Sequence, residues 1–235
     1  MAKLPILMYH NVSLNKSLGL TISTEKLEEQ FHYLQKNNYT TLFVSQLENK
    51  ALIKPKSVVI TFDDVTQNQL LYALPLLRKY KFKATFFIPF AYVGKTDLWN
   101  EGSEEIMSYE QLRSLDNEFI ELGHHSYNHN KYDSLSKEEI QQDFDKSFEC
   151  ISENLLNVYP ALAYPYGNYP KNKLQKSLFF ELLKKNNIKM AFRIGNRVNV
   201  FPFKSNYEIQ RIDIKGEDSL LRFKLKLCFG KLKLF

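Results

Sequence analysis

The sequence predicts an α/β fold in which seven or eight short parallel strands alternate with helices. Short runs rich in β-branched and aromatic residues recur along the 235-residue chain, separated by longer segments with helical periodicity. Hydrophobic residues make up 44% of the chain and charged residues 25%, a globular composition with enough apolar side chains for a large core. No apolar run approaches the roughly 18 to 20 residues that span a bilayer, so no transmembrane helix is expected.

Eight strand-like runs stand between polar or turn-forming residues. They cover residues 5–10, 40–44, 57–63, 83–89, 119–123, 161–165, 188–193 and 207–214. Strands that alternate with helices in this way form either a small irregular barrel or a doubly wound open sheet. Both folds place their ligand sites at the carboxyl ends of the strands.

Amphipathic patterns and capping signals predict the helices between these strands. An apolar face runs through Leu27, Phe31 and Leu34. Capping boxes, in which Ser is followed three residues later by Gln or Glu, start two helices at Ser108 and Ser136. The second of these is expected to bury Ile140, Phe144, Phe148, Ile151 and Leu155. A further helix is marked by Leu174, Leu178 and Leu182, and Pro75 should kink or divide the helix over 68–80.

The unusual polar residues fall at the ends of the predicted strands. They are His10, Asp63, Asp64, His124, His125, His129 and Tyr166. Taken singly, an Asp after a strand is usually a turn or capping residue, and a lone His is more often a structural residue. Because the carboxyl ends of parallel strands meet at one rim, however, we expect these side chains to converge there.

Four of these residues, two Asp and two His, have the chemistry from which a metal site can be built. Two adjacent carboxylates, Asp63 and Asp64, repel each other unless a metal or a cation keeps them ionised. The spacing of His125 and His129 can bring two imidazoles to one side of a helical turn, where both can bind one ion. Two His and one carboxylate, with open positions for water and substrate, are typical of catalytic zinc sites.

The sequence resembles the polysaccharide deacetylases with a NodB-homology domain (carbohydrate esterase family 4). Residues 61–64 (Thr-Phe-Asp-Asp), 125–129 (His-Ser-Tyr-Asn-His) and 163–167 (Ala-Tyr-Pro-Tyr-Gly) look like the family's three motifs, in the family's order and intervals. The resemblance spans about residues 4 to 214. It implies a distorted, incomplete (β/α) barrel of about seven parallel strands, and an enzyme that hydrolyses N-acetyl groups of polysaccharides or other N-acetylated sugars.

The resemblance also implies a role for each motif residue. Asp64, His125 and His129 would bind a divalent metal, usually zinc, with cobalt or nickel as other options. Asp63 would be the general base, and the backbone N–H of Tyr166 would help to hold the oxyanion. His124 does not fit the motif's spacing and is expected beside the site, behind the ligands.

Three departures from the family pattern bear on activity. No His follows His129, so the carboxyl-terminal Leu-x-His of the common pattern is missing, and His10 would be the general acid. This arrangement resembles the circularly permuted, poly-N-acetylglucosamine deacetylase-like subgroup. Ala163 stands where the third motif has Arg, and the only tryptophan, Trp99, lies outside any Asp-x-x-Asp-Trp motif. Arg211 is then the candidate to orient Asp63, with a surface or another ion-pair role as the alternative.

Val65 stands where the family has Gly after the two aspartates. Either the turn differs here, or this residue adopts a β-like conformation that Val accepts. Two other functions therefore stay open: a carbohydrate-binding pseudoenzyme with a weakened site, and a sugar O-acetyl esterase that uses the same residues.

The charge is concentrated at the carboxyl end. Residues 219–235 carry +5 of the net charge of +6, which leaves +1 for residues 1–218, the predicted catalytic domain. A near-neutral body argues against nucleic-acid binding. The basic amphipathic tail 219–235 is either a last helix or strand that covers the barrel, or a contact with an anionic membrane surface.

The amino terminus does not resemble a signal peptide, so we expect a cytoplasmic protein with two free thiols. Peripheral contact at the inner face of the membrane is the other option.

Overall fold

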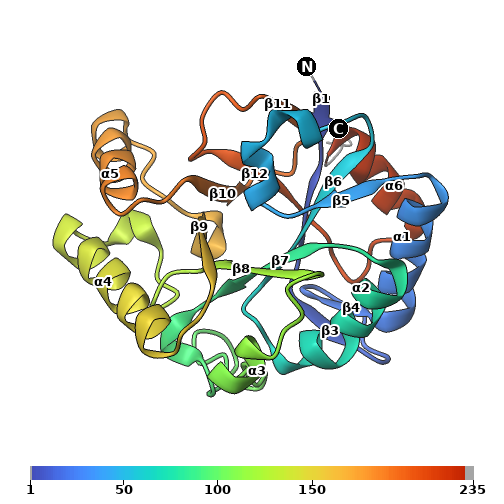
Figure 1. The fold of residues 1–235 in the computed structure, drawn as a ribbon, viewed down its shortest axis with the longest axis horizontal. Coiled ribbons are helices and arrows are strands. Elements are labelled where there is room, and N and C mark those ends of the chain that lie inside the picture. The colour runs from blue at the N-terminus through green and yellow to red at the C-terminus, as the bar shows by residue number, and fades with distance from the viewer. Residues whose placement is uncertain (1, 231–235) are drawn as a thin grey trace.

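Seven parallel strands close into a barrel in the computed structural model, which describes residues 2–230 (Figure 1). In order around the ring they are β2 (Ile6–Tyr9), β12 (Ile209–Asp213), β10 (Met190–Ile194), β9 (Val158–Ala163), β8 (Ile120–His124), β7 (Ala84–Ile88) and β6 (Ser57–Asp63). The pairing of β2 with β6, which sets Met8 opposite Thr61, closes the ring. The predicted α/β barrel of about seven parallel strands is therefore confirmed, and the open doubly wound sheet is excluded.

Five further strands lie outside the ring. One of the eight predicted strands, β5 (Thr40–Leu42), is not part of the ring. It pairs with the beginning of β6, where Thr40 lies opposite Ser57. Two small sheets pair β1 (Ala2–Leu4) with β11 (Asn199–Phe201), and β3 (Asn11–Ser13) with β4 (Thr21–Ser23).

Six α-helices surround the barrel (Figure 1). They are α1 (Thr24–Lys36), α2 (Leu74–Tyr80), α3 (Tyr109–Arg113), α4 (Lys137–Glu153), α5 (Lys173–Lys185) and α6 (Leu220–Phe229). Single-turn helices are η1 (Ser45–Glu48), η2 (Lys50–Leu52), η4 (Phe90–Tyr92), η5 (Tyr132–Ser134) and η6 (Pro165–Gly167). Both predicted capping boxes are present, at Ser108 before α3 and at Ser136 before α4. The helix with Pro75 is built in two pieces, the π-helical turn η3 (Gln69–Ala73) followed by α2.

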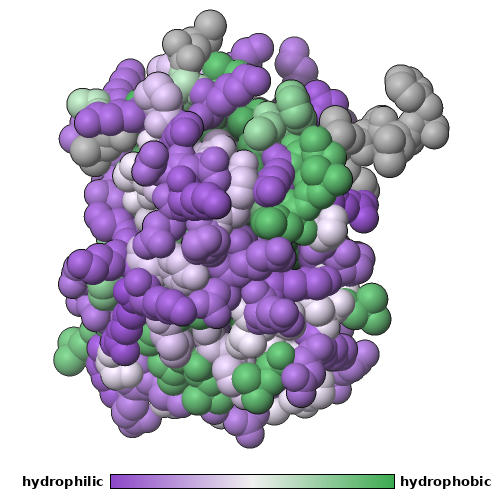
Figure 2. All heavy atoms as spheres, turned by 90° about the vertical axis from the view of Figure 1, so that its right-hand side faces the viewer, coloured by the Kyte–Doolittle hydropathy of each residue, from purple (hydrophilic) through white to green (hydrophobic). Residues whose placement is uncertain are grey.

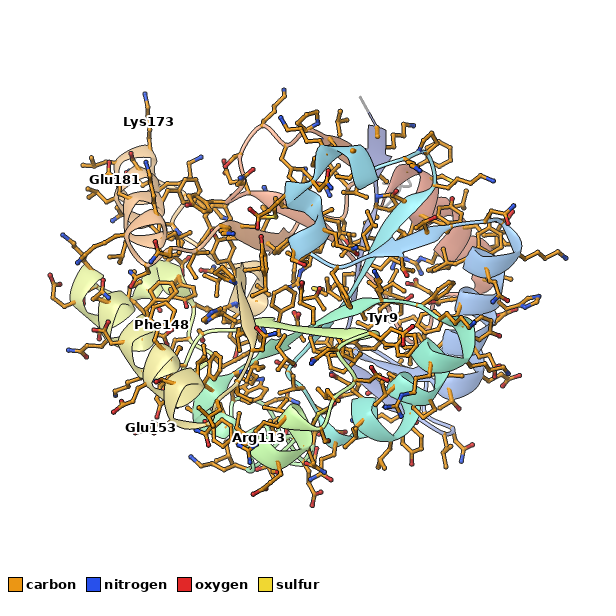
Figure 3. All side chains as sticks on the ribbon, in the orientation of Figure 1. Tyr9, Arg113, Phe148, Glu153, Lys173 and Glu181 are labelled. Carbon is orange, nitrogen blue, oxygen red and sulfur yellow. The ribbon has the colours of Figure 1, made fainter. Side chains whose placement is uncertain are left out.

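Two predicted helix faces need correction. In α4, Ile140 and Phe144 are buried as expected, but Leu155 lies beyond the end of the helix and is 84% exposed. Phe148, labelled on α4 in Figure 3, packs on His124. In α5 the buried residues are Phe179, Leu182 and Leu183, whereas Leu174 and Leu178 are exposed. Figure 3 shows Lys173 and Glu181 on the outer side of α5. The buried face of α5 is thus rotated from the predicted one, because Phe179 packs inward and Leu174 and Leu178 do not.

The interior of the barrel is apolar below and polar at the rim. Alternate residues of β6 share a face, so Val59, Thr61 and Asp63 point the same way at increasing height. Val59 belongs to an apolar cluster with Phe87, Ala161, Phe192 and Ile209, which fills the lower interior. A Cβ on Gly123 would lie 2.6 Å from a ring carbon of Phe87, so a glycine is needed there to admit that ring. The polar groups above rest on a close-packed floor.

The basic carboxyl-terminal segment begins as a packed helix. Phe223 and Leu227 of α6 are buried in the main core, and Phe223 meets Tyr33 of α1 edge to face. Lys226 is also buried, where it pairs with Asp218. Figure 2 shows the side of the molecule that carries α1, α2 and α6 as largely hydrophilic with a hydrophobic patch. Residues 231–235 of the predicted tail lie outside the described residues, and within 2–230 no helix is long and apolar enough to cross a membrane.

Candidate active site

The carboxyl ends of the barrel strands bring most of the predicted polar residues to one rim. A cavity of about 180 Å³ there is lined by His10, Asp63, Asp64, His125, His129 and Tyr166, among others. Arg211, on β12, is fully buried and contacts Asp63. The convergence expected from strand ends is therefore present, although it does not by itself assign a role to any residue.

Three ligand-type atoms form a small triangle in this cavity. Nε2 of His129 lies 3.2 Å from Nε2 of His125 and 3.4 Å from Oδ1 of Asp64. The third side, from His125 Nε2 to Asp64 Oδ1, measures 3.5 Å. Ligands of a tetrahedral zinc ion, each about 2.0 to 2.1 Å from the metal, lie roughly 3.3 Å apart. These residues are the one group of metal-ligating type found among residues 2–230, and the triangle has the size of such a site.

The donor set itself fits a divalent cation. Oδ1 of Asp64 is buried and has no hydrogen-bond partner within the described chain. Burial by itself would raise the pKa of Asp64, but the nearby imidazoles of His129 and His125 outweigh it, so the pKa lies below its ordinary value. Burial lowers the pKa of His125 to about 4, which keeps its imidazole neutral and able to bind a metal at physiological pH.

The backbone after β6 adopts, at Asp64 and Val65, a strained conformation that glycine would adopt without strain. Asp64 has a φ of 76° and Val65 a φ of 45°, both in the left-handed region. The β-like conformation proposed for Val65 is therefore wrong, and this β-branched residue occupies a conformation suited to Gly. Its side chain is fully buried, and its carbonyl accepts a hydrogen bond from the Met107 N–H at 2.9 Å. Packing and hydrogen bonding thus hold the turn in place of glycine's freedom.

A second strained loop carries the two histidines. Ser126 and His129 have φ values of 64° and 55°, and the His129 N–H donates to Ser126 Oγ at 2.8 Å. The Asp143 carboxylate, buried on α4, accepts hydrogen bonds from the Tyr127 N–H at 3.0 Å and from the Tyr132 hydroxyl at 3.0 Å. The sequence interpretation missed Asp143. Its signal was an acid next to Phe144, on the apolar face of the predicted helix.

The two imidazoles are held differently. Nδ1 of His125 lies 2.8 Å from the Ala163 carbonyl, which can only accept a hydrogen bond. This contact selects the tautomer with the proton on Nδ1 and leaves Nε2 free to bind a metal. Nδ1 of His129 is buried without a hydrogen-bond partner among residues 2–230. Its ring instead lies among aromatic rings, stacked on Trp99 and edge-on to Tyr166. Trp99 is a second residue of the site that the sequence interpretation did not include.

Asp63 is bound at both oxygens by one arginine. Arg211 Nη1 and Nη2 donate to Asp63 Oδ1 and Oδ2 at 2.5 and 2.7 Å. Because Arg211 is 0% exposed, the alternative of a surface role is excluded. Burial alone would raise the pKa of Asp63, but the charges of Arg211 and His125 outweigh it and place the pKa well below its usual range. Asp63 is therefore ionised at neutral pH.

His10 and Tyr166 complete the rim. His10 Nε2 lies 3.8 Å from Asp63 Oδ2, with a side chain that is 12% exposed. Tyr166 has a φ of 58° in the turn η6, where the N–H groups of Gly167 and Asn168 donate to the carbonyls of Tyr164 and Pro165. Within the described residues, the Tyr166 N–H takes no part in these turn hydrogen bonds.

His124 points away from this rim. Its ring packs between Phe90 and Phe148, with centroid distances of 5.6 Å to each. Burial lowers the pKa of His124 to about 4. The expected place behind the metal ligands is wrong, because successive residues of a strand face opposite sides and His125 takes the inner one.

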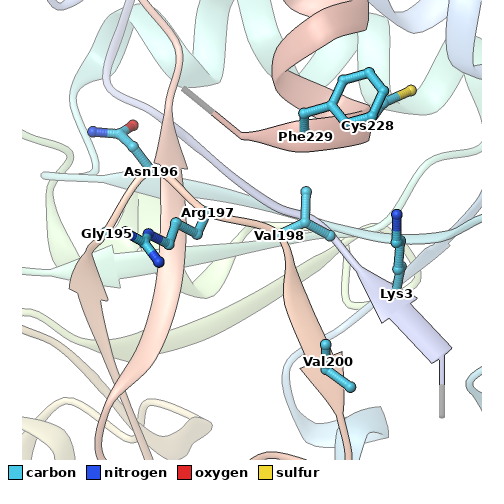
Figure 4. Close-up of a pocket in the computed structure, with 8 residues that line it drawn as sticks. All are labelled: Lys3, Gly195, Asn196, Arg197, Val198, Val200, Cys228 and Phe229. Carbon is cyan, nitrogen blue, oxygen red and sulfur yellow. The ribbon is translucent and has the colours of Figure 1, made fainter. Parts of the chain in front are cut away.

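A larger open cavity, of about 660 Å³, lies elsewhere on the molecule (Figure 4). Its lining includes Lys3, Arg197, Val200, Cys228 and Phe229. Among the residues that the structure describes, its lining has no carboxylate or imidazole, so it lacks the base and the metal-ligand types found at the strand ends. The smaller cavity at the strand ends is the candidate active site.

Comparison with known protein families identifies the family to which the chain belongs. The model of the polysaccharide deacetylase family matches residues 51–183, more than half of the chain. The chain belongs to the polysaccharide deacetylase family. The matched region contains Asp63, Asp64, His125, His129 and Tyr166. It does not reach His10 or Arg211, so the family match does not bear on the roles of these two members of the rim.

Curated relatives of this deacetylase family cover most of the chain. The chain is 29% identical to YxkH of Bacillus subtilis over 178 residues, which are 74% of this chain and 60% of that protein. It is 27% identical over 209 residues to a poly-beta-1,6-N-acetyl-D-glucosamine N-deacetylase of Staphylococcus aureus, covering 84% of this chain and 69% of the relative. The chain thus spans about 60% of the length of YxkH.

Solved structures share the fold. The deacetylase PplD of Streptococcus pyogenes aligns with a TM-score of 0.78 and 22% identity over 96% of this chain and 98% of that chain. IcaB from Ammonifex degensii aligns with a TM-score of 0.79 and 22% identity over 96% of this chain and 97% of that chain. At this identity, the two structures show that the deacetylase barrel is preserved.

Proposed function

We propose that this chain is a metal-dependent hydrolase that removes N-acetyl groups from N-acetylated sugars. The observation that carries the proposal is the position of Asp63, ionised and held by Arg211, with Oδ2 3.8 Å from Nε2 of the ligand-type residue His125. A base next to a metal-sized triangle of donors is what amide hydrolysis by water requires. Asp64, His125 and His129 would hold the ion, with zinc as the expected metal and cobalt or nickel as substitutes.

The reaction consumes one water and yields acetate and a free amine. Asp64, His125 and His129 would hold a divalent ion, which would polarise the acetyl carbonyl and lower the pKa of water toward about 7. Asp63 accepts a proton from the water that attacks the carbonyl carbon. The Tyr166 N–H donates to the oxygen that becomes negatively charged, and His10 gives a proton to the nitrogen as the C–N bond breaks. The proton is necessary because an amide anion is too basic to leave.

Arg211 sets the properties of the base. By binding both oxygens it fixes the plane of the Asp63 carboxylate and keeps it ionised, at the expense of proton affinity. Arg211 thereby supplies from β12 the orienting charge that Ala163 cannot supply from the third motif. This role is the physical reason why the departure at Ala163 is compatible with activity.

The proposed substrate is a polymer or lipid-linked glycan of N-acetylglucosamine type. Support comes from the name of the Staphylococcus aureus relative, which acts on poly-beta-1,6-N-acetyl-D-glucosamine. A sugar O-acetyl esterase and a binding protein without turnover are the competing functions. The strained Val65 turn favours neither, because it leaves the ligand atoms within the dimensions of a metal site.

Acetate release from N-acetylglucosamine oligomers in the presence of zinc tests the proposal. We expect release by the wild-type protein, no release by Asp63→Asn with its metal retained, and loss of both metal and release in His129→Ala. Asp145→Asn, an exposed carboxylate on α4, is the matched control and should behave as wild type. Release from O-acetylated but not N-acetylated sugars would identify an esterase, and no release from either would identify a binding protein.

A cytoplasmic location and contact of the 219–235 tail with an anionic membrane surface are further proposals. Lys226 is buried and Lys224 lies over the Tyr33 ring, whereas the side chain of Arg222 is 57% exposed although it pairs with Asp218. Among the described residues of the tail, Arg222 is therefore the basic side chain most open to lipid. Lys231 and Lys233 lie outside the described residues. Removing residues 231–235 should weaken sedimentation with anionic liposomes, and unchanged binding at low salt would contradict the proposal.

A further inference from the structure

The two histidines of the metal-sized triangle are oriented by unequal means. His125 has the hydrogen bond that metal-binding imidazoles normally make with their second nitrogen, to the Ala163 carbonyl at 2.8 Å. His129 has no such bond, because its Nδ1 is buried without a partner within the described chain. Nevertheless its Nε2 is aimed at the other two donors, at 3.2 and 3.4 Å. Some other contact must fix the rotation of this ring.

Trp99 makes that contact. Its ring stacks on His129 with centroids 4.4 Å apart and an interplanar angle of 28°, whereas Tyr166 and His125 meet the same imidazole edge to face. A stacked face resists rotation of the imidazole about its bond to the backbone. Tyr92 supports the indole from another side, at a centroid distance of 4.6 Å.

The loop that carries Trp99 is itself fixed. The Asp97 carboxylate, 4% exposed, accepts hydrogen bonds from the Glu104 N–H at 2.8 Å and from the Asn100 side chain at 3.0 Å. A bridge between Thr96 and Glu105 closes the base of the loop. Asp97, Trp99 and Asn100 also line the 180 Å³ cavity. The indole is therefore held in place before any ligand arrives.

We propose that Trp99 is a positioning residue for His129, replacing by stacking the hydrogen bond that its Nδ1 lacks. The proposal rests on the metal site of the proposed function. A second argument supports this role. A cation bound at Nε2 would make the imidazole of His129 more positive, and an aromatic face such as that of Trp99 stabilises a positively charged partner. Loss of a residue that orients a metal-binding imidazole by hydrogen bonding typically costs about tenfold or more in metal affinity, and we expect a similar cost when Trp99 is lost.

The chain offers a direct spectroscopic test, since Trp99 is its only tryptophan. Titration of the metal-free wild-type protein with Co²⁺ should quench the tryptophan fluorescence and saturate at one ion per chain. Fluorescence that does not change while Co²⁺ binds would contradict the stacking of Trp99 on a metal ligand. A wild-type protein that binds no Co²⁺ at all would overturn the proposed metal site and this inference together.

Variants separate positioning from a general effect on folding. Co²⁺ affinity, measured by competition with a chromophoric chelator, should fall about tenfold or more in Trp99→Leu and return to within a few-fold of wild type in Trp99→Phe, which keeps a ring. Leu98→Ala, an exposed neighbour on the same loop, is the control and should bind as wild type. Equal affinity of Trp99→Leu and wild type would overturn the inference and leave the proposed function intact. So would a Phe variant as weak as the Leu variant.

Discussion

Arg211 and Asp63 form a two-point ion pair inside the barrel, at Nη1–Oδ1 and Nη2–Oδ2 distances of 2.5 and 2.7 Å. They are 148 residues apart in sequence and come from β12 and β6, which are separated in the ring by β2. Both side chains are almost wholly excluded from solvent. Because both groups are buried, the charge of each is stabilised mainly by the charge of the other.

Replacing Arg211 with Met should therefore damage both the fold and the activity. An unpaired buried carboxylate destabilises a protein by about 3 to 5 kcal/mol, and the pKa of Asp63 should rise because the largest charge that opposes burial is lost. Since the unprotonated carboxylate is the base, the acidic limb of the pH dependence of kcat/KM should move to higher pH. Urea unfolding and the pH–rate profile measure the two effects.

Arg197→Met, at an exposed arginine, is the control and should change neither quantity. An Arg211→Met protein that folds and keeps the wild-type acidic limb would show that Arg211 does not set the ionisation of Asp63.

His10→Phe should reduce kcat for N-acetylated sugars by roughly 10² to 10⁴, the usual contribution of a general acid. The loss should be much smaller with an aryl acetate, whose leaving group departs without a proton. Metal content should not change, because His10 lies outside the triangle of donors. An equal loss on both substrates would mean that His10 acts in some way other than proton donation.

His124→Leu should make the protein less sensitive to mild acid. Burial lowers the pKa of His124 from 6.5 to about 4, so between these values the unfolded chain binds a proton that the folded chain does not. Stability is then lost as the pH falls through this window, by up to about 1.4 kcal/mol per pH unit for one group. Leu, packed between Phe90 and Phe148, removes that contribution.

Unfolding free energies of the metal-free protein at several pH values from 7 to 4.5 (about the window of the titration) test this prediction. The slope for His124→Leu should be shallower than that of wild type by about one proton. Its Co²⁺ affinity should equal that of wild type, because the residue faces away from the site. Reduced affinity would restore a role for His124 beside the metal ligands.

The sequence predicted the barrel strands and the rim because both depend on local signals. Buried parallel strands show as short apolar runs, and motif residues such as Asp64 and His125 follow them directly. The pairing of Arg211 with Asp63 could be suggested only by elimination, since it depends on which strands close the ring. Trp99 was missed because its role comes from loop packing, to which no periodicity corresponds. Asp143 lies on the apolar face of the predicted helix, but its hydrogen bonds to Tyr127 and Tyr132 depend on how the loop before α4 packs against it.

The backbone at Val65 shows another limit of sequence reasoning. A β-branched residue normally argues against a left-handed conformation, and that rule left either a different turn or a β-like residue as the alternatives here. The surrounding contacts override it, with the side chain fully buried and the carbonyl hydrogen-bonded to Met107. Such overrides gather at functional sites, where the fold fixes a strained backbone.

The zinc content of the protein tests the central claim most directly. After saturation with Zn²⁺ and removal of free metal, plasma mass spectrometry of the wild-type protein should give one ion per chain, and His129→Ala and Asp64→Asn should give close to none. Wild-type protein that retains no zinc, or ligand variants that retain as much as wild type, would contradict a metal site formed by Asp64, His125 and His129.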